Sequence, residues 1–471
     1  MNQNTLQHTF DRLATQNIDA LKNRHGYFHN EIARLIRGII PRGQKILDIG
    51  SGNGDTLATS RPSDGVGLDL SPEMIRLASQ RFPKFRFLLG DLETGVPSKE
   101  TFDWIVVSGI LGYLGDIQHA LRNARVVCTP RSRLLIIYYN RFWGPFLRVA
   151  EKLHLKRPQP IINRLTLGDV ERMLDLAGLE VVRRGRKVLF PFYLPLISHW
   201  CNRILTNVGF GRLALVQYLV ARPREEHAAP QNYSVTVVIP ARNERGNIEE
   251  LIRRIPSMGS RTEIIFVEGN SSDGTREEIE RCLAVWGDKR NIKLFDQDGR
   301  GKANAIWKGF REATGDILMI LDADLSVRPE NLPKFYDIVA SGKADFVIGN
   351  RMAYPLPKDA MRFLNYLGNV FFGWLTSRIT GQKFHDSLCG TKVMFKRDWL
   401  RIQNLPPRGV TADPFCDFDL IFGASELHLK FKEVPLRYYA RTYGTTNISR
   451  FSDGWLLLKM CHEAFWKLVC M

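Results

Sequence analysis

Two acidic side chains stand at the end of an apolar run, in DILMILDADLS. The run is typical of a buried strand, and side chains at positions i and i+2 of an extended chain point to the same side. Asp322 and Asp324 therefore predict a pair of carboxylates that can hold Mg²⁺ or Mn²⁺. Such a cation also binds a substrate diphosphate and neutralises charge as that group departs. We expect both aspartates to be catalytic residues as well as metal ligands.

Three further segments place polar residues just after apolar runs. VVIPARNERG ends a strand at Pro240 and enters a helix through Asn243 and Glu244. EIIFVEGNSS ends another strand at Glu268, and DQDGRGKANAIWKG supplies a glycine-bracketed Lys302 before a helical pattern. Helix starts and small polar loops offer backbone N–H groups to anions. The segments together predict a pocket for a nucleoside and its phosphates.

An earlier strand runs into alternating glycines, in ILDIGSGNG. Glycine permits positive φ and a close approach of backbone to ligand, and the helix that follows offers unpaired N–H groups. About twenty residues later the next strand ends in an acid that can bind two ribose hydroxyls, and the third strand ends in GDL. The candidate cofactor-binding residues are Asp48, Gly50, Gly52, Gly54, Asp69 and Asp91. The loop and the ribose acid alone leave a dinucleotide-binding oxidoreductase open, whereas Asp48 and the GDL run favour a different cofactor.

Short apolar runs alternate with longer amphipathic ones from Lys45 onward, which predicts a mostly parallel sheet wound with helices. The alternation stops at RPREEHAAPQN, which is charged and without periodicity, and a second β-rich series begins at YSVTVVIP. We therefore predict two different α/β domains, at residues 1–222 and 233–471, joined by a linker at 223–232. A chain of 471 residues is long enough for two hydrophobic cores.

The segment from about residue 25 to 222 resembles the class I S-adenosylmethionine-dependent methyltransferases, which have a Rossmann-like sheet. Their motif of an acid followed by three alternating glycines appears here from Asp48 to Gly54. The resemblance implies that S-adenosylmethionine is the cofactor, that Asp69 holds its ribose, and that Asp91 lies beside its adenine. It also implies that Ser108 to Leu111 face the methyl-transfer pocket. Methyl transfer needs mainly alignment of the methyl group with a nucleophile, so the sequence does not identify the methyl acceptor.

The segment from about residue 233 to 450 resembles the family 2 glycosyltransferases of the GT-A fold. Within that family it is most similar to the branch of the dolichol-phosphate mannosyltransferases and polyprenyl-phosphate glycosyltransferases. The resemblance implies a nucleotide-sugar donor whose nucleoside contacts Pro240, Asn243, Glu244 and Glu268, with Lys302 near the phosphates. Asp322 and Asp324 would then be the DxD motif that binds Mg²⁺ or Mn²⁺.

The acceptor side is expected to hold a phosphate. An acceptor phosphate is already anionic and can attack a sugar carbon without a base, so its site needs cations more than a catalytic carboxylate. Arg351 in VIGNR and Arg378 in TSRITG stand where the family binds its lipid phosphate, and Asp386 in DSLCGTK also matches. Arg441 in RTYGTTN matches the family's late basic run and completes the expected set. The QxxRW motif of processive polysaccharide synthases is absent from the sequence, which favours transfer of a single sugar.

The net charge of the chain limits which classes of partner it can be expected to bind. It has 66 Lys and Arg against 49 Asp and Glu, a net charge of +17, which attracts nucleic acid, anionic lipid or phosphorylated substrates. We find no zinc-finger pairing, basic heptad helix or aromatic RNA-binding signature, so nucleic acid is not an expected partner. Seven scattered cysteines and a polar start without an export signal predict a cytoplasmic location.

Two stretches are amphipathic and rich in aromatic residues. Both MRFLNYLGNVFFGWLTSR, at 361–378, and the C-terminal WLLLKMCHEAFWKLV lack the ~18 to 20 consecutive apolar residues of a spanning helix. On the first, one helical face carries Phe363, Leu367, Val370, Phe371, Trp374 and Leu375. Buried core helices have the same pattern, but beside a basic surface the two stretches favour peripheral association with anionic lipid.

We therefore expect a bifunctional enzyme. Its second domain would transfer a sugar from a nucleotide-sugar to polyprenyl phosphate with inversion at the anomeric carbon, and its first would methylate a sugar or lipid-linked product. One alternative is glycosylation of a hydroxyl acceptor, for which Asp417 or Asp419 in CDFDL could act as a catalytic base. The other is a first domain that binds the cofactor as a scaffold without catalysis.

Overall fold

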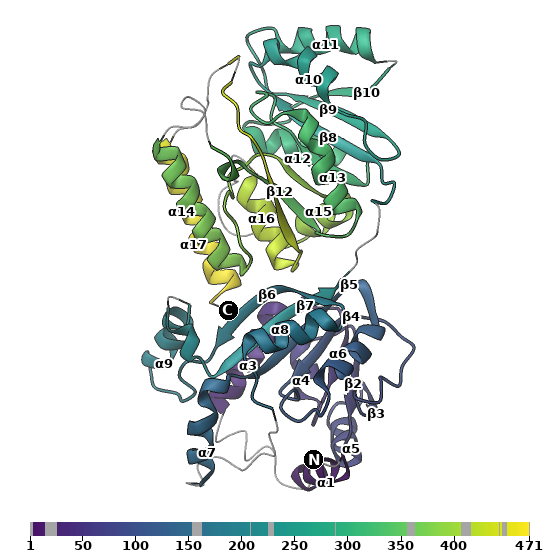
Figure 1. Cartoon of the computed structure of the whole chain (residues 1–471), viewed down its shortest axis with the longest axis vertical. Coiled ribbons are helices and arrows are strands. Elements are labelled where there is room, and N and C mark those ends of the chain that lie inside the picture. Colours follow the sequence, from purple (N-terminus) through teal and green to yellow (C-terminus); the bar gives the residue numbers. More distant parts are fainter. Residues whose placement is uncertain are drawn as a thin grey trace. The chain divides into compact units, whose positions relative to one another are not determined.

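The structure is a computed structural model that describes residues 3–14, 26–152, 163–207, 209–224, 230–287, 289–355, 363–406, 416–441, 443–444 and 450–470. The chain divides into two compact units (Figure 1). Unit 1 comprises Met1–Arg224 with Leu468–Met471, and unit 2 comprises Glu225–Lys467. The division falls in the segment 223–232 that the sequence predicts as a linker, of which residues 225–229 lie outside the described residues. The last four residues, which the sequence assigns to the second domain, group with unit 1.

Unit 1 is built on a seven-stranded sheet in the order β3-β2-β1-β4-β5-β7-β6. The strands are β1 (Lys45–Ile49), β2 (Asp64–Asp69), β3 (Arg86–Leu89), β4 (Phe102–Ser108), β5 (Cys128–Tyr139), β6 (Leu179–Lys187) and β7 (Val216–Pro223). The first five run parallel, with Asp48 opposite Val106, whereas β7 is antiparallel to both neighbours. Parallel strands end on one edge, so the loops after β1, β2 and β4 meet there.

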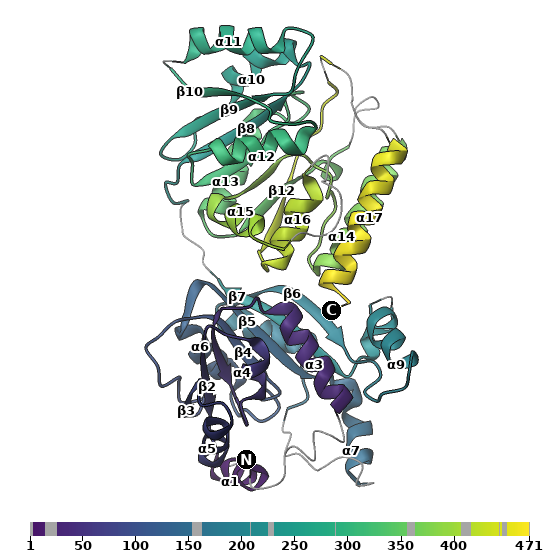
Figure 2. The same cartoon turned by 180° about the vertical axis from the view of Figure 1, so that it is seen from behind.

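Helices cover both faces of this sheet, with α6 and α8 in front of it in Figure 1 and α3 and α4 in front of it in the reverse view of Figure 2. The helices of unit 1 are α1 (Gln3–Ala14), α3 (Gly26–Ile39), α4 (Asp55–Ser60), α5 (Pro72–Arg81), α6 (Ile117–Val126), α7 (Gly144–Lys152), α8 (Leu167–Leu176) and α9 (Ile197–Trp200). Each face has its own apolar core: one cluster includes Leu47, Leu121 and Leu174, and the other includes Ile46 and Leu35. Burial on both faces explains why these strands read as continuous apolar runs.

Unit 2 has a second seven-stranded sheet, in the order β10-β9-β8-β11-β13-β12-β14. Its strands are β8 (Val235–Ala241), β9 (Thr262–Glu268), β10 (Asn291–Asp296), β11 (Ile317–Ile320), β12 (Phe346–Asn350), β13 (Lys392–Phe395) and β14 (Phe431–Pro435). Only β13 is antiparallel to its neighbours. The sequence indicates β8, β9, β11 and β12 but not the other three, whose short runs are less apolar or are interrupted by charges.

The helices of unit 2 also lie on both faces of its sheet, since α13 faces the viewer in Figure 1 and α12 does so in Figure 2. They are α10 (Ile248–Arg254), α11 (Thr275–Trp286), α12 (Lys302–Glu312), α13 (Leu332–Ala340), α14 (Phe363–Thr380), α15 (Lys396–Gln403), α16 (Asp417–Glu426) and α17 (Arg450–Leu468). No helix among the described residues is long and apolar enough to cross a membrane. The predicted fold class, two α/β domains, is confirmed.

Candidate functional sites

The glycine loop after β1 approaches the neighbouring loops closely. Gly50, Gly52 and Gly54 all have positive φ, at 72°, 51° and 83°. The Gly50 amide donates to the Leu68 carbonyl at 2.7 Å, and a Cβ built on Gly50 would lie 2.2 Å from Cγ2 of Ile110. Only glycine fits this position, because a side chain would meet the loop that follows β4. The backbone of the loop is therefore exposed to any ligand bound at this edge of the sheet.

Two buried acids flank the loop. The Asp69 carboxylate accepts hydrogen bonds from the amides of Gly52 (2.8 Å) and Ser71 (3.0 Å), which fixes its position at the end of β2. Neither carboxylate oxygen of Asp48 accepts a hydrogen bond of good geometry from the described residues, although the Leu57 amide lies near enough to lower the pKa of this carboxyl slightly. Burial, and then the charge of Asp69, raise the pKa of Asp48 to about 8. A buried carboxyl without a cationic partner fits a cationic ligand, and S-adenosylmethionine carries positive charge on its sulfonium and amino groups.

Asp91 follows β3, and its carboxylate accepts from the Glu93 amide at 2.9 Å. The loop after β4, which contains Ser108 to Leu111, begins where that strand ends. Helix α1 packs against the loops that follow β2 and β4: the Ser71 hydroxyl donates to Asp11 Oδ1 at 2.5 Å, and the Phe10 ring meets the Tyr113 ring edge-on at 5.3 Å. Sequence reasoning missed this helix because MNQNTLQHTF is polar and its one aromatic residue gives no periodic signal.

In unit 2, two strand-end loops are tied together by the predicted nucleoside-binding residues. Asn243 has a left-handed φ of 56°, its amide donates to Ser271 Oγ at 3.0 Å, and its Oδ1 accepts from the Ser272 amide at 2.9 Å. The Glu268 carboxylate accepts from the amides of Asn270 (3.0 Å) and Ser271 (2.6 Å). Pro240 pairs with Val267 beside them, near the end of β8. These residues lie together at the carboxyl ends of β8 and β9.

Asp322 and Lys302 form an ion pair at the end of β11. Burial would raise the pKa of Asp322, but the charges of Lys302, Lys392 and Arg351 outweigh it and hold that pKa below its usual value. A Cβ built on Gly390 would lie 2.2 Å from Asp322 Oδ2 and 2.7 Å from Lys302 Nζ. The backbone at Gly390 therefore forms one wall of the ion pair and leaves no space for a side chain.

Asp324 is held from two directions. Its Oδ1 accepts from the Ser326 amide at 3.0 Å, and its Oδ2 pairs with Arg441 Nη2 at 2.8 Å. Arg441 also approaches Glu244 Oε1 at 4.0 Å. Burial, and then the charges of Asp324 and Asp322, raise the pKa of Glu244 to about 7, although its hydrogen bond from Asn247 opposes this. The structure thus brings Glu244, Asp322 and Asp324 into one electrostatic cluster.

The remaining predicted residues lie in different surroundings. Arg351 makes a two-pronged ion pair with the fully buried Asp386, at 2.7 and 2.9 Å, and its own side chain is 11% exposed. Arg378 lies on the exposed side of α14, with its guanidinium 5.7 Å from the centre of the Trp374 ring. Of the three arginines expected at an acceptor phosphate, only Arg441 touches the acidic cluster directly.

The two candidate bases are separated. Asp417 forms an ion pair with the completely buried Lys392, which also donates to the Cys389 carbonyl at 2.6 Å. Asp419, two positions further along α16, lines a pocket walled by Trp307, Leu405 and Lys467. The charge of Asp417 helps to raise the pKa of Lys302, so Asp417 lies near the acidic cluster.

Comparison with known proteins finds one family in unit 1 and a different family in unit 2. Residues 20–184 match the family described as methyltransferase domain, and residues 236–401 match glycosyl transferase family 2. A dolichol-phosphate mannosyltransferase of Saccharomyces cerevisiae is 38% identical over 226 residues, which are 45% of this chain and 80% of that protein. A second dolichol-phosphate mannosyltransferase, from Pyrococcus furiosus, is 37% identical over 120 residues, 25% of this chain and 33% of that protein.

Among solved structures, a SAM-dependent methyltransferase of Thermotoga maritima is similar to this chain. The two are 16% identical, with a TM-score of 0.38, over 46% of this chain and 99% of the other.

Proposed function

This chain belongs to the family 2 glycosyltransferases and carries a methyltransferase domain ahead of its glycosyltransferase domain, and on that premise we propose that it is bifunctional. Unit 2 transfers a sugar from a nucleotide-sugar to a polyprenyl-phosphate-type acceptor, with inversion at the anomeric carbon. Unit 1 transfers a methyl group from S-adenosylmethionine to a sugar or lipid-linked acceptor. The observation that carries the first part is the cluster of Glu244, Asp322 and Asp324 facing Lys302 and Arg441.

The donor site is supported by the balance of charges in this cluster. The cluster has three carboxyl groups, and the pKa of one of them, Glu244, is raised to about 7. A raised pKa means that negative charge is disfavoured there, so a bound cation would be favourable. Asp322 and Asp324 would hold a Mg²⁺ or Mn²⁺ ion, which neutralises the diphosphate of the departing nucleotide when it is bound. Lys302 lies at the first turn of α12, where it and the helix N-terminus favour phosphate.

A phosphate acceptor fits the acceptor side better than a hydroxyl. A phosphate oxygen attacks the anomeric carbon, the bond to the nucleotide diphosphate breaks, and the bonding electrons leave with the diphosphate, so no proton has to be removed. A hydroxyl acceptor needs a free carboxylate as base. Asp417 is neutralised by Lys392, and Asp419 lines a different pocket, so neither supports that alternative.

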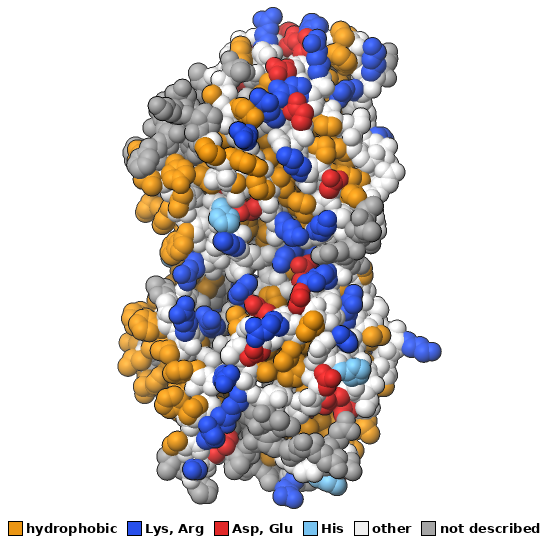
Figure 3. Space-filling model, viewed as in Figure 1, with side chains coloured by type: hydrophobic (Ala, Val, Ile, Leu, Met, Phe, Trp, Pro, Cys, Tyr) orange, Lys and Arg blue, Asp and Glu red, His pale blue; other side chains and the backbone are white. Residues whose placement is uncertain are grey.

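A membrane surface is supported by helix α14, which exposes more large apolar side chains than it buries. Its buried side carries Asn369, Thr376 and Thr380 together with the apolar Phe372 and Ile379. Its exposed side carries six large apolar residues, Leu364, Tyr366, Leu367, Val370, Phe371 and Trp374. Figure 3 shows hydrophobic side chains gathered over this edge of unit 2. An exposed apolar patch of this kind is typical of a surface that binds lipid, and we propose peripheral membrane association through α14.

Replacing Asp324 with asparagine tests the donor site. Asp324→Asn keeps the shape but loses the charge that holds the cation, so sugar transfer to a short-chain polyprenyl phosphate should fall by at least a hundredfold. EDTA should remove the activity of the parent, and Mn²⁺ should restore it. Asp337→Asn, on the exposed side of α13, is the matched control and should keep full activity. Undiminished transfer by Asp324→Asn, or transfer that survives EDTA, would contradict the DxD assignment.

The methyltransferase activity is tested separately, by release of S-adenosylhomocysteine in the presence of extracted lipid. Release that depends on the lipid supports catalysis by unit 1. Binding of S-adenosylmethionine without any release would favour the scaffold alternative.

A further inference from the structure

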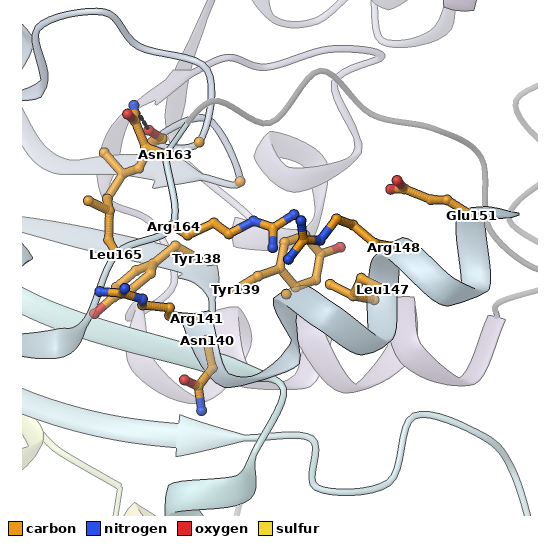
Figure 4. A pocket seen from close by; sticks show the side chains of 14 residues that line it. Tyr138, Tyr139, Asn140, Arg141, Leu147, Arg148, Glu151, Asn163, Arg164 and Leu165 are labelled. Carbon is orange, nitrogen blue, oxygen red and sulfur yellow. Dashed lines mark hydrogen bonds between the residues drawn. The ribbon is translucent and has the colours of Figure 1, made fainter.

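Unit 1 contains a pocket next to the loop that follows β4 (Figure 4). It has about 680 Å³ of free space including its open mouth, and its wall includes Gly109, Leu111, Tyr139 and Leu147. Gly109 and Leu111 belong to the loop where the methyl group of S-adenosylmethionine is expected. The pocket therefore lies where a methyl acceptor has to enter.

Two asparagines fix the walls of this pocket. The Asn163 side chain donates to the carbonyls of Leu111 (3.1 Å) and Leu114 (2.6 Å), which holds the following residue, Arg164, over the loop after β4. The Asn140 side chain donates to the Ala214 carbonyl at 2.8 Å and accepts from the Phe142 amide at 3.1 Å. It thereby sets the direction of the short helix and of α7 that follow β5. A pocket with walls held in this way is preorganised for a ligand.

The pocket is strongly basic. Arg141, Arg148 and Arg164 line it against a single acid, Glu151. In Figure 4 the guanidinium groups of Arg148 and Arg164 turn toward each other beside the Tyr139 ring. Neither side chain makes a hydrogen bond or ion pair with another residue that the structure describes. All three arginines are exposed to solvent, and guanidinium groups that lie together without a carboxylate between them attract an anion. A phosphate can accept two parallel hydrogen bonds from an arginine.

Glycine at position 144 allows this arrangement. A Cβ built on Gly144 would lie 2.5 Å from Arg164 Nη1 and 3.1 Å from its Cδ, so the arginine lies directly across the first turn of α7. Leu147, Arg148 and Glu151 continue the same face of the helix, because residues three and four apart lie on one side.

We propose that this pocket is the methyl-acceptor site of unit 1 and that it binds an acceptor carrying a phosphate group through Arg148 and Arg164. The inference deepens the proposed methyltransferase function and rests on it. A lone pair of an acceptor hydroxyl forms the bond to the methyl carbon. The carbon–sulfur bond breaks with its electrons on sulfur, giving S-adenosylhomocysteine, and the hydroxyl proton passes to water. The phosphate serves as the handle that orients the hydroxyl.

The phosphate could belong to a lipid or to a free sugar phosphate, and the neighbouring surface favours the lipid. On the opposite side of α7 from the pocket, Phe146 and Val149 are 56% and 55% exposed, and Phe142 just before the helix is exposed as well. An apolar chain attached to the phosphate could lie against these side chains.

The test is calorimetric titration of the full chain with three probes: farnesyl phosphate, hexose 1-phosphate and farnesol. Arg148→Ala combined with Arg164→Ala should weaken binding of farnesyl phosphate to one site by about a hundredfold, since a charge-assisted hydrogen bond contributes about tenfold or more. Arg131→Ala, an exposed arginine at the other end of β5, is the matched control and should leave that site unchanged. Affinity for S-adenosylmethionine should be the same in all variants, which shows that unit 1 is folded.

Arg378→Ala separates this inference from the proposed glycosyltransferase acceptor site. If both sites exist, the parent binds two molecules of farnesyl phosphate, and Arg378→Ala weakens only the site that the Arg148 and Arg164 substitutions leave intact. If unit 2 does not bind lipid phosphate, the parent binds one molecule, and it is lost only in the Arg148 and Arg164 variant. Hexose 1-phosphate binding as tightly as farnesyl phosphate supports a free sugar phosphate as the source. Unchanged binding in the double variant, farnesol binding as tightly as farnesyl phosphate, or no phosphate binding by the parent would each overturn the proposal.

Discussion

The acids of the two candidate sites differ in whether a cationic side chain lies beside them. Asp322 and Asp324 are each paired with a cationic side chain, Lys302 and Arg441, so their positions are fixed before any ligand arrives. Asp48 has no such partner and keeps its proton at neutral pH. A buried acid without a partner destabilises the ionised form of the protein, which makes Asp48 sensitive to pH in a way that the other two are not.

We therefore predict that Asp48→Asn changes how the stability of unit 1 depends on pH. The pKa of an ordinary aspartate, as in the unfolded chain, is 3.8, whereas the pKa of Asp48 in the folded protein is about 8. Between these values the folded protein binds one more proton than the unfolded chain, so this group's contribution to stability falls as pH rises. The asparagine variant lacks this loss. Its melting temperature should exceed that of the parent by several degrees at about pH 8, and the difference should shrink toward about pH 5. A constant difference across this range, measured by scanning calorimetry, would contradict the assignment.

A second prediction for a single residue concerns Gly50. Gly50→Ala combines a left-handed backbone with a Cβ 2.2 Å from Ile110, so the loop must move away from the cofactor site. Affinity for S-adenosylmethionine should fall at least tenfold. Gly43→Ala is matched in backbone, with φ of 75°, but its Cβ meets nothing within 4 Å. It should cost about 1 kcal/mol of stability and leave binding unchanged. Equal affinities in the two variants would show that the contact with Ile110 is not important.

Residues at strand ends were predictable from the sequence, but their partners were not. The apolar runs before Asp48 and Asp322 mark strand ends because both faces of each sheet are buried, and that pattern is local. The pairing of Arg441 with Asp324 and of Arg351 with Asp386 joins segments that are distant along the chain. The sequence assigned Arg351, like Arg441, to an acceptor phosphate, which stays a prediction. The packing of Phe10 on Tyr113 carried no local signal at all.

At the scale of elements, α14 shows that an amphipathic sequence pattern does not by itself tell which face of a helix is buried. The sequence predicts one apolar face, and a core helix would bury it. In the structure the small and polar residues Gly373, Thr376 and Thr380 face inward, and a Cβ on Gly373 would lie 2.8 Å from the His385 carbonyl oxygen. Most of the large apolar residues are left outside, whereas Phe372 and Ile379 are buried on the inner side, where the centre of the Phe372 ring lies 5.8 Å from that of Phe418.

We predict that α14 binds lipid through these side chains. Leu367→Ser and Trp374→Ser, at positions that are 47% and 54% exposed, should each weaken binding to vesicles containing anionic phospholipid by about tenfold. Leu400→Ser is the matched control, because Leu400 is 46% exposed on α15, outside the α14 patch. Co-sedimentation with vesicles measures the difference. Vesicle binding by both α14 variants at the level of the Leu400→Ser control would exclude this helix as the membrane contact.

At the scale of the whole molecule, each unit has its own sheet and its own buried cores. Units of this kind unfold as separate cooperative blocks. We predict two thermal transitions in the full chain. S-adenosylmethionine should raise only one of them, and GDP or UDP with Mn²⁺ only the other, because a ligand stabilises the unit that binds it. Asp69→Ala should abolish the first shift and preserve the second. A single transition that both ligands raise together would show that the two units unfold as one.

Gly390 has a consequence for the natural variation that this enzyme can tolerate. Its α-carbon faces Asp322 and Lys302 with space for a hydrogen atom only. In a library that substitutes every codon in turn, we expect position 390 to lose sugar transfer with every replacement, alanine included. Neighbouring codons that encode surface residues, such as Lys383, should accept most changes. We therefore expect that even one added methyl group at position 390 removes the proposed sugar transfer.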